Sequence, residues 1–151
     1  MREQKTELVA LMPLILETLN EGHEVTFSPH GSSMLPLLRE GRDTVTLSKP
    51  HGRLKKYDIP LYRRENGQFV LHRVVAVGET YTCIGDNQFA LEYGIKDEQI
   101  IAVCTSFARK GKKYSADAPL WRAYAVFWHY SRFPRRVWRA VRRRITGLFE
   151  K

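Results

Sequence analysis

The chain of 151 residues is long enough for one domain with its own core, and its 43% hydrophobic and 27% charged residues exclude a disordered chain. Its net charge of +9 is concentrated at one end. Residues 119–151 carry eight arginines and Lys151 against Glu150 alone, whereas residues 1–118 are close to neutral. The two parts therefore need separate explanations.

Residues 1–22 are expected to form an N-terminal amphipathic helix. Its apolar positions fall on one face, at Leu8, Leu11, Met12, Ile15 and Leu19. Residues 23–115 consist of short segments rich in Val, Ile, Thr, Tyr and Phe, separated by Gly, Pro, Asn and Asp. "ENGQ" at 65–68 is typical of a hairpin turn. Short strands without helices between them favour a coiled antiparallel sheet, so we expect a mainly β (α+β) fold.

Residues 116–151 form a basic, aromatic tail in which two helices are expected, over 119–131 and 134–149. Each begins at a proline, where a missing N–H costs least. The second places Val137, Trp138, Val141, Ile145, Leu148 and Phe149 on one face, largely opposite its arginines. No run of about 18 uncharged apolar residues is present, and the first residues lack the layout of a signal peptide, so we expect no transmembrane helix.

The remaining composition argues against metal and cofactor chemistry. Cys83 and Cys104 lie in apolar runs without metal-ligand spacing, so we expect buried thiols, with a single disulfide as the alternative. The histidines outside the candidate site lack partners at ligand spacing, and there is neither a Walker loop nor a GxGxxG motif. We therefore expect no metal and no cofactor.

Chemistry is suggested first by "HGSSMLPLL" at 30–38. Gly31 permits a sharp turn, and the apolar residues from Met34 to Pro36 are expected to anchor that turn in the core. A serine becomes a nucleophile only with a base to take its proton and donors for the oxyanion. Ser32 and Ser33 are the candidates; an ordinary solvated loop is the alternative.

A base is offered by "FVLHRVVAV" at 69–77, where His72 lies within a hydrophobic strand. Its ordinary pKa near 6.5 suits proton transfer, although a lone strand histidine is also common in a core. His30, three residues before Ser33, is the rival base. In "CIGDNQFALE", Asp86 either serves the turn or orients His72, and Glu92 is a second acid.

Together and in this order, these segments resemble the serine peptidases of the signal peptidase I and LexA type, the S24/S26 group, over residues 25–105. The matching boxes are Gly31-Ser32-Ser33-Met34-Leu35-Pro36, Gly41-Arg42-Asp43-Thr44-Val45, Tyr57-Asp58-Ile59-Pro60 and Gly85-Asp86-Asn87. The second is one residue looser than in the family, and the third lacks its glycine.

The resemblance implies that Ser33 is the nucleophile and that His72, directly before an arginine, is the base. Histidine there is similar to the endoplasmic-reticulum and archaeal-type signal peptidases, in which Asp86 would be the acidic partner. Glu92 stands where that branch has a second Asp. Gly31 replaces a serine that assists the oxyanion in many relatives, which leaves the Ser33 amide, with the Ser32 hydroxyl, in that role.

The tail is expected to contact an anionic membrane surface, because it combines arginines with an aromatic face. The residues expected there are Trp121, Trp128, Arg135, Trp138, Arg139, Arg142 and Arg143. The alternatives are packing of the aromatic face on the domain and nucleic-acid binding, for which no reader motif is present.

The function expected from these features is a membrane-associated serine endopeptidase that cleaves a preprotein or peptide. A catalytically inactive, membrane-attached adaptor on the same fold is the alternative. A LexA-like self-cleaving regulator is a weaker one, since the chain has no N-terminal DNA-binding domain.

Overall fold

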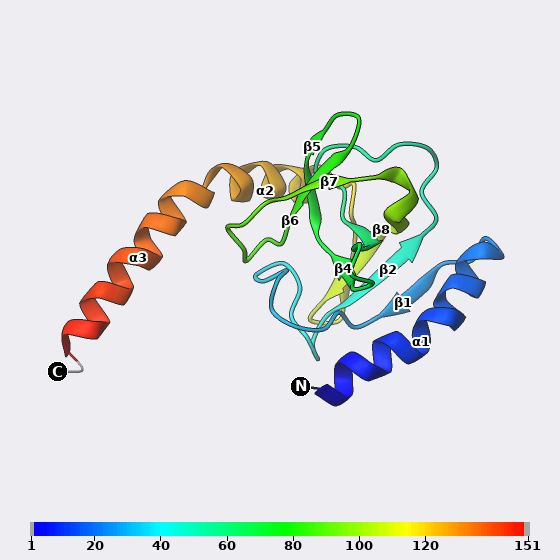
Figure 1. Ribbon diagram of the computed structural model, residues 1–151, viewed down its shortest axis with the longest axis horizontal. Coiled ribbons are helices and arrows are strands. Elements are labelled where there is room, and N and C mark those ends of the chain that lie inside the picture. The colour runs from blue at the N-terminus through cyan, green and yellow to red at the C-terminus, as the bar shows by residue number, and fades with distance from the viewer. Residues whose placement is uncertain (1, 150–151) are drawn as a thin grey trace.

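The computed structural model describes residues 2–149, and it describes side-chain surroundings for residues 9–147. The fold is α+β, with antiparallel sheets, an N-terminal helix and two C-terminal helices, as the sequence predicts; helix and strand each make up about three tenths of the chain. The β domain lies in the centre, α1 lies along one side of it, and α2 and α3 leave from another (Figure 1).

The larger sheet curls into a half-barrel. Its strands pair antiparallel in the order β1-β2-β8-β3-β4, and β9 pairs antiparallel with β8. They are β1 (Val25–Phe27), β2 (Thr44–Ser48), β3 (Pro60–Arg63), β4 (Phe69–Leu71), β8 (Ile100–Arg109) and β9 (Lys112–Ser115). The hairpin predicted at 65–68 is confirmed, because Leu61 of β3 pairs with Leu71 of β4 across it.

The smaller sheet holds three antiparallel strands in the order β5-β6-β7. They are β5 (Arg73–Val77), β6 (Tyr81–Ile84) and β7 (Glu92–Ile95), and a short 3₁₀ helix, η1 (Asp97–Gln99), leads from β7 back to β8.

The sequence suggests a single strand over 69–77, but the structure divides this segment into two strands. Its first part, β4, belongs to the larger sheet and its second part, β5, to the smaller one, so the chain crosses between sheets at His72. Burial also changes along this segment, since His72 and Val74 are buried, whereas Ala76 is exposed. A polar residue therefore lies buried at a junction of two sheets, where its hydrogen-bonding groups need partners.

Helix α1 (Arg2–Asn20) runs through Pro13, which neither starts nor ends it. Met12, Ile15 and Leu19 are buried in the core of the larger sheet, as predicted, whereas Leu11 points to solvent. The side chain of Leu8 lies outside the described residues.

Cys83 and Cys104 are buried free thiols, so the prediction of thiols is confirmed. They belong to separate apolar clusters, one beneath each sheet. Burial raises the pKa of Cys104 to about 12, which keeps this thiol protonated and unreactive at neutral pH.

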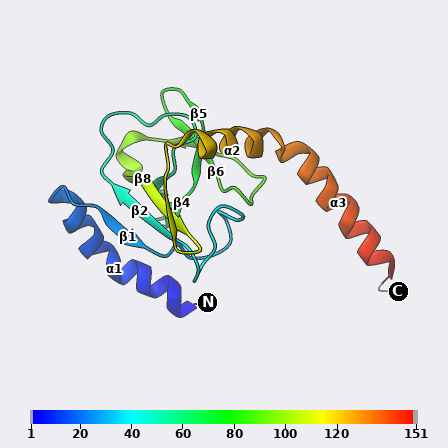
Figure 2. The ribbon, with the colours of Figure 1, turned by 180° about the vertical axis from the view of Figure 1, so that it is seen from behind.

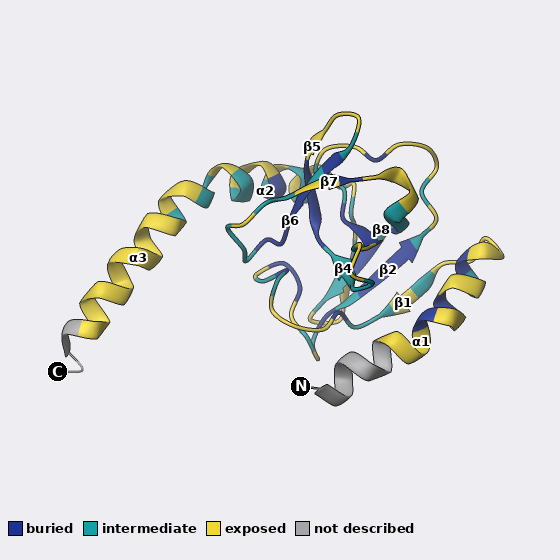
Figure 3. Cartoon of the chain, in the orientation of Figure 1, coloured by how far each residue is buried: buried dark blue, intermediate teal, exposed yellow. Residues whose placement is uncertain are grey.

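The tail forms helices α2 (Pro119–Tyr130) and α3 (Arg132–Phe149), close to the predicted ranges. Helix α2 lies against the β domain, and α3 extends away from it in both views (Figures 1 and 2). Most of α3 is exposed on all sides (Figure 3). Among residues 2–149, no helix has both the length and the apolar character needed to cross a bilayer.

Candidate active site

Glu40 binds the turn that carries the two serines. Gly31 adopts φ of +82°, a conformation that glycine enters without strain. Its N–H donates to Oε2 of Glu40 at 2.9 Å, and Nδ1 of His30 lies 3.1 Å from Oε1 of the same carboxylate. The hydrogen bond with His30 lowers the pKa of Glu40, so the carboxylate is ionised at neutral pH. His30 therefore serves this turn.

The residues that follow the serines anchor the turn in the core, but fewer of them do so than the sequence suggests. Met34 is buried, as expected, and Leu37 and Leu38 are buried with it in the larger core. Leu35 is only half-buried and Pro36 is exposed, so these two do not act as anchors. Their side chains are left at the surface beside the serines.

The loop after β6 also binds the serine turn. The Asn87 N–H donates to the Ser33 carbonyl at 2.8 Å, and the Asn87 side-chain amide donates to the Ser32 carbonyl at 3.1 Å. Gly85 is required by the same contact, because a Cβ there would lie 2.7 Å from the Ser33 oxygen. The Gly-Asp-Asn box therefore fixes the position of both serines.

Ser33 keeps its own reactive groups free. Neither its N–H nor its hydroxyl makes a hydrogen bond to any residue within the described part of the chain, although its carbonyl is bound. The residue is half-buried. A fixed backbone with an unused amide donor and an unused hydroxyl is what a nucleophile with an oxyanion donor needs.

His72 is held by Glu92. Nδ1 lies 3.0 Å from Glu92 Oε1 and 3.3 Å from the Tyr62 hydroxyl. The other ring nitrogen, Nε2, makes no hydrogen bond within residues 9–147, and it is not among the fully buried nitrogens that lack a partner. The buried ring is therefore bound at Nδ1, and Nε2 has no hydrogen-bond partner among the described residues.

Burial sets the charge of this ring. It lowers the pKa of His72 below its ordinary value, while the carboxylate of Glu92 opposes the shift and the guanidinium of Arg64 adds to it. The imidazole is therefore neutral at pH 7. A proton on Nδ1, facing Glu92, leaves the lone pair on Nε2, which is the form that a general base requires.

Glu92 is fixed in turn by Arg64, a residue that the sequence did not single out. The guanidinium donates from Nε to Oε2 at 2.9 Å, and from Nη2 to Oε1. Burial would raise the pKa of Glu92, but the hydrogen bonds from Arg64 and Tyr62 outweigh it and lower that pKa. Glu92 is therefore an oriented carboxylate. Arg64 directly follows β3 and directly precedes the predicted hairpin turn. Its place in the fold depends on the pairing of β3 with β4, which the sequence alone does not show.

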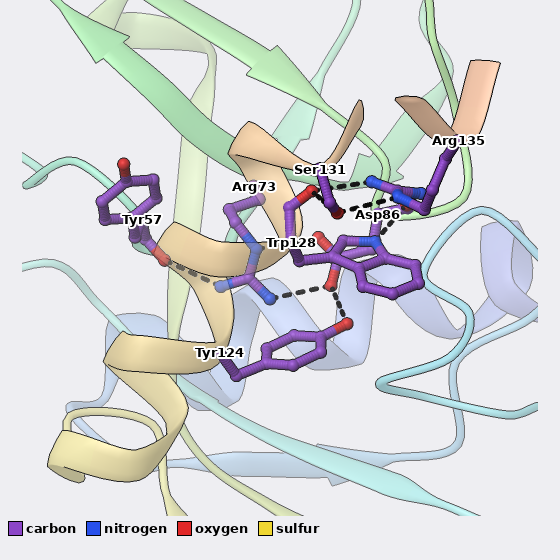
Figure 4. A network of polar contacts seen from close by, with 7 residues as sticks. All are labelled: Tyr57, Arg73, Asp86, Tyr124, Trp128, Ser131 and Arg135. Atoms are coloured by element: carbon purple, nitrogen blue, oxygen red, sulfur yellow. Dashed lines mark hydrogen bonds and ion pairs between the residues drawn. The ribbon is translucent and has the colours of Figure 1, made fainter. Parts of the chain in front are cut away.

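Asp86 does not orient His72, and this prediction is corrected. Its carboxylate forms a bidentate pair with Arg73, at 2.8 and 2.9 Å, and accepts from the Tyr124 hydroxyl at 3.2 Å (Figure 4). Arg73 also donates to the Tyr57 carbonyl, and the Trp128 indole donates to the Asp86 carbonyl. Asp86 is thus bound by Arg73 and Tyr124, and no hydrogen bond joins it to His72 among the described residues.

The two halves of the site are linked through this ion pair. His72 is followed by Arg73, Arg73 binds Asp86, and the neighbours of Asp86 hold the serine turn. No hydrogen bond joins Ser33 to His72 among the described residues. The structure thus brings the serines together with the Gly-Asp-Asn box, and His72 together with Glu92.

Some of the residues predicted at a membrane surface contact the domain. Trp121 packs edge-on against Phe107 and Tyr114 at the larger core. The Trp128 indole stacks on Tyr124, and Arg135 lies 3.7 Å above that indole while donating to the Trp128 carbonyl.

These residues therefore attach the tail to the domain. Arg139 is also engaged, through Asn87. The remaining predicted residues, Trp138, Arg142 and Arg143, are exposed on α3, and the side chains of Leu148 and Phe149 lie outside the described range.

Across the described residues, no group of three or more His, Cys, Asp or Glu side chains is placed to hold a metal ion. Comparison with known proteins gives no match to a family model, a curated protein or a solved structure. The function must therefore be argued from the site itself.

Proposed function

We propose that the protein is a serine endopeptidase of the signal peptidase I-like type, acting on a peptide or preprotein segment. The observation that carries this proposal is the state of His72: Nδ1 lies 3.0 Å from the Glu92 carboxylate, and Nε2 makes no hydrogen bond among the described residues. A carboxylate at Nδ1 holds the proton on that nitrogen and prepares the imidazole to accept a second proton on Nε2.

In the proposed mechanism, the Ser33 hydroxyl attacks the scissile carbonyl carbon while His72 Nε2 takes its proton. Glu92 stabilises the imidazolium that forms, and the Ser33 N–H donates to the developing oxyanion. His72 then gives the proton to the leaving amine, and water releases the acyl group from Ser33. A hydrogen bond between Ser33 and His72 must form when substrate binds, since catalytic hydrogen bonds often tighten only in the complex.

The first test compares three proteins on a diverse peptide library, read by mass spectrometry: wild type, Ser33→Ala and Ser32→Ala. Cuts by wild type that are lost in Ser33→Ala are expected, because no other group would replace the hydroxyl. Ser32→Ala is the matched control, and it should retain the same cuts at a reduced rate at most. Persistence of the wild-type cuts in Ser33→Ala would overturn the proposal.

An inactive adaptor on this fold is the second candidate, favoured by the missing hydrogen bond between Ser33 and His72. A fluorophosphonate probe separates the two functions. Stoichiometric labelling that requires both Ser33 and His72 supports the peptidase. Absence of labelling under conditions that label a control serine protease supports the adaptor.

We also propose that α3 attaches the protein to an anionic membrane surface. Four large apolar side chains of this helix are between 42% and 76% exposed, namely Phe133, Val137, Val141 and Ile145. Their spacing of four places them on one face. Arg135 and Arg139 contact the domain from the opposite face, so the apolar face points away from the β sheets. The helix carries no acidic residue among those described.

Val137→Gln is expected to weaken binding to vesicles of phosphatidylglycerol by about ten-fold, since burying a valine contributes about 1.5–3 kcal/mol. Val77→Gln is the matched control, because Val77 is exposed to a similar extent on β5. Co-sedimentation with anionic and with purely phosphatidylcholine vesicles provides the measurement. Equal binding of both variants, or of both vesicle types, would contradict this proposal.

A further inference from the structure

A groove of about 290 Å³ lies directly beside the serine turn, at the junction of α2 and α3. One wall is formed by Leu35 and Pro36, the surface residues that follow Ser33. Asn87 forms part of the groove between them and the helices. The opposite wall is formed by Trp138 and by the guanidinium groups of Arg135 and Arg139.

The groove is joined to the proposed nucleophile by Asn87. This residue donates to the carbonyls of both Ser32 and Ser33, at 3.1 and 2.8 Å, while its side-chain oxygen accepts from Arg139. An extended peptide advances about 3.3 Å per residue. A substrate whose scissile bond lies at Ser33 therefore reaches the groove within a few residues.

The lining is positively charged and contains no carboxylate. Arg135 is held in place by its contact with the Trp128 ring and by hydrogen bonds to Ser131 and to main-chain carbonyls. Arg139 donates only to Asn87 within the described residues, and its guanidinium lies 5.0 Å from the Phe89 ring. A guanidinium has more N–H groups than this, so Arg139, which lines the groove, keeps donors without a partner among the described residues. Free, preoriented arginine donors favour a planar carboxylate.

We infer that this groove binds an aspartate or glutamate side chain of the peptide that Ser33 cleaves, with Arg139 as the principal contact. This inference rests on the proposed function. A peptide carboxylate fits better than a lipid phosphate for a geometric reason. The apolar face assigned to the membrane, with Phe133, Val137 and Val141, lies on the side of α3 opposite to Arg135 and Arg139.

The test uses the full chain in two arms without vesicles, and co-sedimentation of the same variants with phosphatidylglycerol vesicles is measured separately. In the cleavage arm, a peptide cut by the wild type that contains a single acidic residue is compared with the same peptide carrying Gln or Asn there. A preference in kcat/KM of about ten-fold for the acidic peptide is expected, since hydrogen bonds between charged groups are strong. Arg139→Gln should remove that preference, whereas Arg136→Gln, which removes the same charge from the same helix outside the groove, should retain it.

In the binding arm, the Ser33→Ala variant is titrated with two fluorescein-labelled peptide pools, one with a central Glu and the other with a central Gln. Tighter binding of the Glu pool that depends on Arg139 and not on Arg136 supports the inference, even if no peptide is cut and the proposed function fails. Equal binding or cleavage of acidic and neutral peptides overturns it. So does loss of phosphatidylglycerol vesicle binding in Arg139→Gln while the two pools bind equally, because the groove would then be a headgroup site.

Discussion

Glu92→Gln is expected to lower the rate of peptide cleavage by on the order of 10²–10⁴-fold, as removal of the orienting carboxylate does in other serine–histidine enzymes. The substitution keeps the size of the side chain but removes the charge that faces Nδ1 of His72 at 3.0 Å. The imidazolium formed during attack would then lie in a largely buried site next to Arg64 without its counter-ion. Single-turnover kinetics with a peptide from the library would measure this loss.

The pH dependence gives the same variant a second readout. Activity requires neutral His72, whose pKa burial lowers, so the wild-type rate should fall with decreasing pH only through a midpoint below about 6.5. The charge of Glu92 raises that pKa. Its removal should therefore move the midpoint of the acid limb to still lower pH, because His72 becomes harder to protonate.

Glu98→Gln is the matched control for this experiment. Glu98 is an exposed carboxylate of η1 that makes no contact with His72, so both the rate and the pH profile should stay close to those of wild type. The opposite result is also informative. Full activity in Glu92→Gln, together with an inactive but folded Asp86→Asn variant, would assign the orienting role to Asp86 after all.

The choice between these two acids marks the limit of what the sequence could predict at the site. Both follow His72 at a turn or shortly after it, and the box containing Asp86 is the better marked. What separates them is the partner that each carboxylate binds. Asp86 pairs with Arg73, whereas Glu92 on β7 is opposite Cys83 and lies 3.0 Å from Nδ1 of His72. Register irregularities in both strand pairs hide this from a count of alternation.

More of the fold than of the site could be predicted from the sequence, because the fold depends on composition and turns. Segments rich in β-branched residues and the turn at 65–68 were enough to predict an antiparallel sheet. The division of 69–77 between two sheets was not predictable, since Leu71, His72 and Arg73 continue an apolar run without a turn residue. Long-range pairing decides this break.

The aspartates of the other matching boxes have the same kind of role as Asp86. Asp43 is buried and pairs with Arg42, a contact that lowers its pKa to about 2. Asp58 pairs with Arg122 of α2 at 2.8 Å. Each of these carboxylates binds an arginine and holds a loop or helix in place. A motif aspartate beside a reactive serine can therefore be a positioning residue.

Composition alone predicted that the aromatic residues of the tail act together at a membrane. In the structure some of them contact the domain and others are exposed. Trp121 and Trp128 of α2 pack on the domain. Phe127 and Tyr130 of the same helix are exposed, as are Phe133 and Trp138 of α3. Composition also differs along the tail, since α2 holds one arginine and five aromatic residues, whereas α3 holds seven arginines and three aromatic residues. The contacts of each helix with the domain show which of these residues attach the tail.

Asp86→Asn is expected to reduce the free energy of unfolding by about 3–5 kcal/mol, because it leaves a buried guanidinium without its counter-ion. The side chains of Asp86 and Arg73 are 2% and 6% exposed, so water cannot replace the lost charge. This is a large part of the roughly 5–15 kcal/mol that stabilises a typical domain. Urea unfolding followed by tryptophan fluorescence would measure the difference.

Asp58→Asn is the control, since the same change removes an ion pair of equal length that is more open to solvent. Its cost should not exceed about 1 kcal/mol. The double variant Arg73→Met, Asp86→Leu should recover much of the stability lost in Asp86→Asn, because no unpaired charge remains buried. If Asp86→Asn unfolds within about 1 kcal/mol of wild type, the ion pair is not what holds the loop.

Damage at Asp86 should also reach Ser33 through the main chain. Gly85 and Asn87 contact the Ser33 carbonyl, so loosening the residue between them frees the serine turn. Labelling of Ser33 by a fluorophosphonate probe should therefore slow in Asp86→Asn at urea concentrations where the variant is still folded. In Asp58→Asn the labelling rate should follow wild type. Unchanged labelling in folded Asp86→Asn would mean that the loop positions the serines through Asn87 and Gly85 alone.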